Sequence, residues 1–216
     1  RAVNTKTYGT MLLTREDLAR LLKPEEYLEI VETAFRAHAD GKTLAPSLMH
    51  VDADGGEFHI KAGGLQLDRS YFALKANGGF FGNARFDMPP IQGVILLCDA
   101  ESGYPLALMD STAITLARTG ATTAVAARHL ARADSRVVTI CGCGNQGQVQ
   151  LRYLLQTCTQ IERAYAWDID HARAQPLRQQ EGGVEVGAQH VLPVLERMLD
   201  SGPPPDGARV VHEDVH

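Results

Sequence analysis

The strongest indication of the fold is the hexapeptide Gly142-Cys143-Gly144-Asn145-Gln146-Gly147. It is a complete G-x-G-x-x-G pattern that follows a β-branched run at 136–141 and opens a helix predicted over about 146–156. In a dinucleotide-binding turn the first glycine makes the bend, the second admits a pyrophosphate, and the third lets helix and strand pack closely. We therefore expect a dinucleotide to be bound by Gly142, Gly144, Asn145, Gln146 and Gly147.

A second predicted strand, 163–168, completes a βαβ unit with the first strand and the helix. Its last residue is Asp168, 21 residues after Gly147. An acid at this position accepts hydrogen bonds from the adenosine ribose and repels a 2′-phosphate, so NAD is favoured. Arg173 nearby leaves NADP as an alternative. The competing interpretation is a surface glycine turn with an incidental aspartate.

The segments before this unit predict helices first and a sheet afterwards. A helix is expected to begin near Thr14 and a second to run from Pro24 to a stop at Gly41. Strands are expected at 57–62, 71–76 and 93–98, with 106–109 as a hairpin partner, and a helix rich in small residues runs to about 130. Beyond 168 the pattern predicts a helix at 171–180, a strand at 184–186 and a helix at 189–199.

This order of segments predicts an α/β protein in which an α+β substrate and dimerisation domain precedes a Rossmann-type domain. We place the first domain at 1–112, the dinucleotide-binding domain at 113–200, and a Pro/Gly-rich linker and tail at 201–216. An alternative assigns the tail to the first domain, and the Rossmann domain is expected to lack part of a complete doubly wound sheet.

Composition excludes several classes of function. The chain has 216 residues, 44% of them hydrophobic and 22% charged, and a net charge of −5 without a basic run, which argues against a nucleic-acid partner. No apolar stretch reaches the roughly 20 residues that span a bilayer, and residues 1–6 lack signal-peptide features, so a cytoplasmic location is expected. Cys98, Cys141 and Cys143 are interpreted as reduced thiols in the core, and no metal site is expected.

Three cations occupy positions where charge is costly. Lys61 and Lys75 interrupt apolar strands, although a lysine on a half-buried strand can also face solvent. Arg118 is surrounded by alanine, threonine and glycine in a helix that must pack closely, so plain exposure is the less expected outcome. A lysine and an arginine beside a nicotinamide would suit a substrate carboxylate.

Four segments together resemble the ornithine cyclodeaminase/mu-crystallin family over about residues 10 to 186: 72–77, 98–105, 116–127 and 142–147. The resemblance implies a homodimeric, two-domain enzyme that binds NAD(H) or NADP(H) and a small amino acid. It implies that Lys75 is the active-site lysine and that Arg118 binds the substrate carboxylate. It further implies substrate contacts from His59, Lys61 and Gln92.

The resemblance also implies a reaction at the α-carbon of a small amino acid. The leading expectation is cyclodeamination, such as ornithine to proline and ammonia. The alternatives are an NAD(P)H-dependent ketimine reductase or amino-acid dehydrogenase, and a non-catalytic, crystallin-like NAD(P)-binding protein. Two departures from the family pattern are Ser47, where several members have arginine, and an end about a hundred residues earlier than usual, before the position of the cyclodeaminase aspartate.

Overall fold

The computed structural model describes residues 9–174 and 185–187. The chain divides into two compact units, residues 1–122 and 123–216. This division falls inside a long helix, and the domain boundary that the sequence suggests, between 112 and 113, stays a prediction. The predicted helix at 189–199 and the tail at 201–216 lie outside the described residues, as does part of the helix predicted at 171–180.

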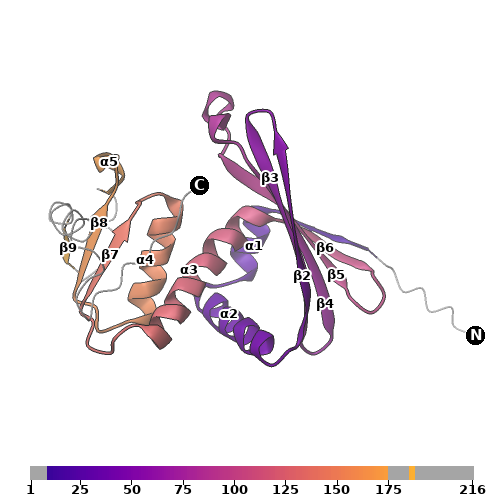
Figure 1. Ribbon diagram of the computed structural model, residues 1–216, viewed down its shortest axis with the longest axis horizontal. Helices are drawn as coiled ribbons and strands as arrows, with labels where there is room; N and C mark the ends of the chain where they lie inside the picture. Colours follow the sequence, from indigo (N-terminus) through magenta and orange to yellow (C-terminus); the bar gives the residue numbers. More distant parts are fainter. Residues whose placement is uncertain (1–8, 175–184, 188–216) are drawn as a thin grey trace, which may run out of the picture. The chain divides into compact units, whose positions relative to one another are not determined.

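The first unit consists of a six-stranded sheet with helices on one side (Figure 1). Its elements are β1 (Met11–Leu13), α1 (Arg15–Leu21), α2 (Pro24–Ala39), β2 (Thr43–Ala53), β3 (Gly56–Gln66), β4 (Ser70–Gly79), the 3₁₀ helix η1 (Phe81–Phe86), β5 (Ile91–Asp99), β6 (Pro105–Asp110) and α3 (Ser111–Leu130), the last of which continues into the second unit. The strand order is β1-β6-β5-β4-β3-β2, and only the β1–β6 pair is parallel.

Local chemistry explains where the first two helices begin and end. The Thr14 hydroxyl accepts the Asp17 N–H while the Asp17 carboxylate accepts the Thr14 N–H, so a capping box starts α1. Pro24 occupies the first turn of α2, and Gly41 follows that helix with φ of 72°. These predicted signals are confirmed.

Strands β1 and β2 were not expected from the sequence. Strand β2 is an edge strand that contains Pro46, and its pairing with β3 shifts register between Leu44 and Ser47. Proline has no N–H to donate, but at an irregular position of an edge strand no hydrogen bond between strands is lost. Because proline is rare in strands, its presence makes β2 hard to predict from the sequence. The predicted strands β3, β4 and β5 are present and are longer than expected.

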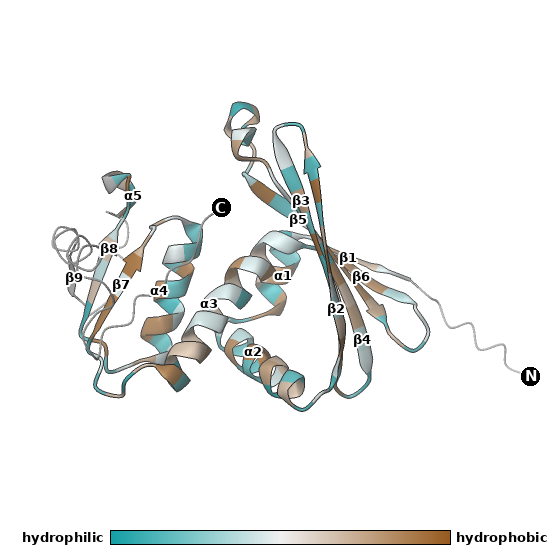
Figure 2. Cartoon of the chain, viewed as in Figure 1, coloured by the Kyte–Doolittle hydropathy of each residue, from teal (hydrophilic) through white to brown (hydrophobic). Residues whose placement is uncertain are grey.

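The second unit contains the predicted βαβ arrangement. Its elements are β7 (Val137–Cys141), α4 (Asn145–Thr157), β8 (Arg163–Trp167), α5 (His171–Ala174) and β9 (Glu185–Gly187). The three strands are parallel in the order β7-β8-β9, which corresponds to one half of a doubly wound sheet. Figure 2 shows the apolar character of β7, whose Ile140 packs with Leu151 and Ala164 in the buried core of this unit.

Two expectations about burial are wrong. Cys141 is exposed, whereas Cys98, Cys143 and Cys158 are buried free thiols. Arg118 is exposed as well, although Ala121, one turn further along α3, is fully buried. Among the described residues, no helix combines the length and the hydropathy that a bilayer crossing requires.

Candidate functional site

The cationic cluster of the first unit is built by sheet register. Lys61 of β3 lies directly opposite Lys75 of β4, and Lys75 lies opposite Ile95 of β5. Directly paired residues of antiparallel strands point to the same face, so the two lysines are neighbours. Lys61 is exposed and Lys75 is partly buried.

Lys75 has an altered acidity. Burial is the main cause, and the positive charges of Arg118 and Lys61 add to it, so the pKa of Lys75 falls from 10.5 to about 8. Because both charges act on Lys75, the three cations form one electrostatic cluster. A cluster of this kind attracts a carboxylate, and its central lysine can exchange a proton close to neutral pH.

A buried hydrogen bond joins the strand of Lys75 to the helix of Arg118. The hydroxyl of Ser111, fully buried at the start of α3, donates to Asn77 Oδ1 at 2.7 Å. Asn77 follows Lys75 by two positions on the same face of β4, and Ser111 precedes Arg118 by two helical turns on one side of α3. The bond therefore sets the helix against the strand that carries the lysine.

Thr115 is a further polar group on α3, one turn before Arg118. Its Oγ1 is shielded from solvent and has no hydrogen-bond partner among the described residues. Buried hydroxyls are normally paired, so Thr115 is an unusual polar group on the helix that carries Arg118. Neither Thr115 nor the Asn77–Ser111 bond was recognised in the sequence, where a single threonine or asparagine gives no signal of its own.

The other predicted substrate residues do not all share this face. His59 lies on the lysine face, where its Nε2 contacts Glu57 Oε1 at 2.9 Å. Gln92 pairs with Gly78, and strand alternation places it on the opposite face from Lys75. The register thus brings Lys61, His59 and Lys75 together and leaves Gln92 apart from them.

The glycine turn of the second unit shows why two of its glycines are needed. Gly142 has φ of 93°, a conformation that other residues rarely adopt. A Cβ at Gly147 would overlap the carbonyl oxygen of Gly142, so a side chain there would push α4 away from β7. This is the close approach of helix and strand that the motif requires.

Three observations test whether this turn fits a dinucleotide. A Cβ at Gly144 would meet no atom within 4 Å, so there is open space beside the N-terminus of α4. Gly144 is also the N-cap and offers no side chain to the helix donors. Gln146 Nε2 is shielded from solvent and lacks a hydrogen-bond partner among the described residues, whereas Asn145 is exposed. The open space beside Gly144 and the uncapped N–H groups of α4 fit a bound pyrophosphate.

Asp168 lies against the same turn. It is only 5% exposed, and its two carboxylate oxygens accept the N–H groups of Cys143, at 2.6 Å, and of Asp170, at 2.9 Å. Asp168 follows β8 directly and lies beside the glycine turn, which is the place where the acid of a dinucleotide-binding βαβ unit contacts the ribose. Arg173 lies 3.6 Å from Asp170, which holds this cation in an ion pair. The arrangement fits NAD better than a 2′-phosphorylated cofactor.

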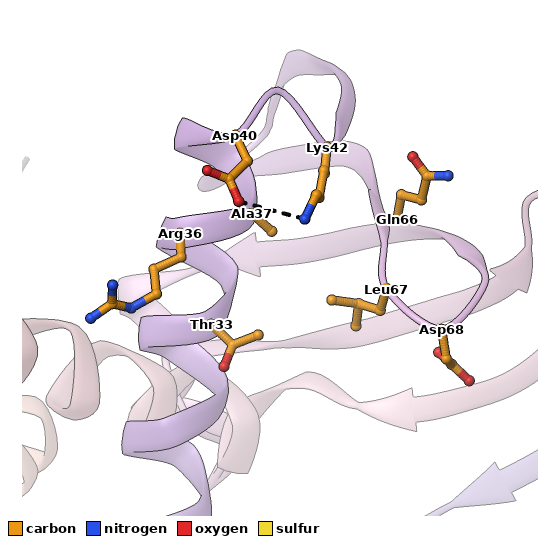
Figure 3. Close-up of a pocket in the computed structure, with 8 residues that line it drawn as sticks. All are labelled: Thr33, Arg36, Ala37, Asp40, Lys42, Gln66, Leu67 and Asp68. Carbon is orange, nitrogen blue, oxygen red and sulfur yellow. Dashed lines mark ion pairs between the residues drawn. The ribbon is translucent and has the colours of Figure 1, made fainter.

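A separate cavity of about 610 Å³ lies in the first unit, between the end of α2 and the turn after β3 (Figure 3). Its cations are paired, since Lys42 Nζ lies 3.5 Å from Asp40 and Arg36 lies 2.7 Å from Glu32. None of the predicted site residues lines this cavity. It does not change the assignment of the site.

Comparison with known proteins identifies the family. The model of the ornithine cyclodeaminase/mu-crystallin family matches residues 8–191. The chain belongs to this family. Alanine dehydrogenase of Archaeoglobus fulgidus is 34% identical over 160 residues, which cover 74% of this chain and 48% of that protein.

Two solved structures share the fold. An archaeal alanine dehydrogenase dimer with bound NAD matches with a TM-score of 0.78 and 31% identity. The Δ¹-pyrroline-2-carboxylate reductase of Thermococcus litoralis, in complex with NADH and L-proline, matches with a TM-score of 0.74 and 33% identity. Each match covers 83% of this chain and 56% of the other. The chain thus spans about half the length of the relatives it matches, and its second unit is of the Rossmann type.

Proposed function

We propose that this chain is part of an NAD-dependent enzyme that transfers hydride at the α-carbon of a small amino acid or of the corresponding imine. The observation that carries the proposal is the convergence of Lys61, Lys75 and Arg118, with the pKa of Lys75 lowered to about 8. Such a cluster suits a substrate that combines a carboxylate with a nitrogen that gains or loses a proton. Relatives named for alanine and for pyrroline carboxylate support the same substrate class.

Each residue has a proposed role. Arg118 binds the carboxylate through its guanidinium fork, and Lys61 adds positive charge. Lys75 exchanges a proton with the substrate, because a lysine that titrates near pH 8 is partly neutral under physiological conditions. His59, on the same face, is a candidate substrate contact.

The cofactor residues are proposed separately in the second unit. Gly142, Gly144 and Gly147 form the turn, Gln146 and the N–H groups of α4 contact the pyrophosphate, and Asp168 binds the ribose. When bound, the nicotinamide supplies the hydride chemistry. The protein supplies the position of the substrate and the proton.

Cyclodeamination, the leading expectation from the sequence, is the second candidate. It uses the same carboxylate and proton contacts, and the family name supports it. Net consumption of NADH with a keto acid plus ammonia, or with a cyclic imine, supports the dehydrogenase or reductase. Ammonia release from ornithine without a net change in NADH absorbance supports cyclodeamination instead.

The decisive experiment separates cofactor binding from turnover. Lys75→Ala and Arg118→Ala should abolish turnover while NADH affinity, followed by fluorescence of the single tryptophan Trp167, stays nearly unchanged. Arg20→Ala is the matched control, because this arginine is 75% exposed and pairs with Asp17 on α1. Wild-type turnover in Lys75→Ala or Arg118→Ala would remove that residue from the proposed site.

Cofactor binding has its own test. Gly144→Val should lose NADH binding because its side chain fills the space proposed for the pyrophosphate. Gly82→Val, which also enters open space but in η1, is the control. Unchanged NADH affinity in Gly144→Val would refute the assignment of the turn. Binding of NADH without turnover on any amino acid would favour the non-catalytic alternative.

A homodimer is proposed on the basis of the sheet face opposite Lys75. Strand alternation gives this face a set of exposed apolar side chains: Leu12, Met49, Val51, Phe58, Val94 and Leu108. Exposed apolar surface of this kind is typical of an interface between subunits. The dimeric alanine dehydrogenase structure supports the same assembly. Light scattering of the wild type and of Val94→Lys tests it, and a monomeric wild type would exclude it.

A further inference from the structure

Four side chains of types that can bind metal ions lie on one face of the hairpin formed by β2 and β3. His50 is directly opposite His59, and Asp52 is directly opposite Glu57. The two pairs are two positions apart along each strand, so all four side chains point to the same side of the sheet. Six residues separate His50 from Glu57 in the sequence. The register of the β2–β3 pairing is what brings the two histidines and the two acids together.

The Glu57 carboxylate lies between the two imidazoles. Its Oε1 is 2.9 Å from His59 Nε2, and its Oε2 is 3.2 Å from His50 Nε2. Asp52 Oδ1 lies 3.0 Å from the same His50 nitrogen. The imidazole rings meet edge to face with centroids 4.6 Å apart. One ligand atom from each of His50, Glu57 and His59 lies within 4.8 Å of the other two.

We propose that His50, Glu57 and His59 bind a divalent first-row transition metal of the Zn²⁺ class. Two imidazole nitrogens and one carboxylate are a donor set that such ions prefer, whereas Ca²⁺ and Mg²⁺ prefer oxygen ligands alone. Ligand atoms around tetrahedral Zn²⁺ lie about 3.3 Å apart, close to the distance from each Glu57 oxygen to its own imidazole nitrogen. The ligand nitrogens of the two imidazoles lie within 4.8 Å of each other, and binding requires them to approach to about 3.3 Å.

Access to this site is open. The side chains of His50, His59 and Glu57 are 46%, 47% and 32% exposed, so an ion can enter and can keep water in its remaining positions. Asp52 is 93% exposed and can serve as a fourth ligand or as a partner for His50. The alternative is a group of surface ion pairs, which contributes little to stability and binds no metal.

The test is titration of the full chain, first stripped with a chelator, with ZnCl₂ followed by calorimetry, and with Co²⁺ followed by visible absorption. The wild type should bind one equivalent of Zn²⁺ at this site and show the absorption bands of coordinated Co²⁺. His50→Ala should lower Zn²⁺ affinity at least about tenfold. His38→Ala, an exposed histidine on α2, should retain wild-type affinity.

Two further variants keep the result interpretable. Cys141→Ser should retain binding, because Cys141, the exposed cysteine among the described residues, is an alternative ligand for Zn²⁺ that the proposal does not use. His50→Gln, checked for folding by circular dichroism, should lose binding as His50→Ala does. Failure of the wild type to bind, or equal affinity in wild type and both His50 variants, would overturn the proposal. NADH binding by His50→Ala is expected to be unchanged, so this result is independent of the proposed enzyme function.

Discussion

Replacing Lys75 with methionine should stabilise the first unit at neutral pH. The lowered pKa of Lys75 means that its charged form is disfavoured in the folded state. The difference between 10.5 and about 8 corresponds to at most about 3 kcal/mol. Because the side chain is only partly buried, solvent screening reduces this to about 1–2 kcal/mol. Lys75→Met removes that cost.

The stability difference between the wild type and Lys75→Met should shrink as the pH rises. Below about pH 8 the lysine is charged in both states, and the folded state bears the full cost. Between about pH 8 and 10.5 only the unfolded state still binds the proton, so the stability of the wild type rises toward that of the variant. Above this range the charge-dependent part of the difference disappears.

Urea unfolding followed by circular dichroism measures this effect. Lys75→Met should have a larger free energy of unfolding than the wild type at about pH 7. This advantage should be smaller by about 1–2 kcal/mol at about pH 10. Lys42→Met, at an exposed lysine paired with Asp40, should change stability by less than about 0.5 kcal/mol at both pH values. A Lys75→Met difference that is independent of pH would refute the reasoning.

Three further predictions concern packing and reactivity. Gly147→Ala should destabilise the second unit by about 1–3 kcal/mol because its Cβ overlaps the Gly142 carbonyl; wild-type stability, measured by tryptophan fluorescence, would show that helix and strand are not in close contact. Ser111→Ala should cost about 1–3 kcal/mol by leaving Asn77 unpaired, and should cost much less in an Asn77→Ala background; equal costs in both backgrounds would argue against the bond. Burial and nearby negative charge raise the pKa of Cys143 to about 11, so iodoacetamide should modify this thiol only after unfolding, and rapid modification of the native chain in peptide mass spectra would contradict this.

Much of the second unit could be predicted because its signals are local. The β-branched run before Gly142, the three glycines and the acid at Asp168 all follow from backbone requirements within one βαβ unit. The hydrogen bonds that Asp168 accepts from Cys143 and Asp170 were not predictable. They depend on how the ends of β7 and β8 meet.

The first unit was predicted less completely because its site is non-local. The sequence identified Lys61 and Lys75 as unusual cations, but their adjacency comes from the antiparallel register of β3 and β4. The same register separates Gln92 from them. Strand β2 was missed, and with it the cluster that joins His50 to Glu57 and His59.

The family, the glycine turn and the helix boundaries could be predicted from the amino-acid sequence alone, because caps, glycine bends and hydrophobic periods act over a few residues. Which side chains meet depends on how strands and helices far apart in the chain pack together. Strand pairing places Lys61 beside Lys75, and the Asn77–Ser111 bond sets α3 against β4. Burial and the neighbouring cations then lower the pKa of Lys75. Neither effect is visible in the sequence, because the groups that cause it are far apart in the chain.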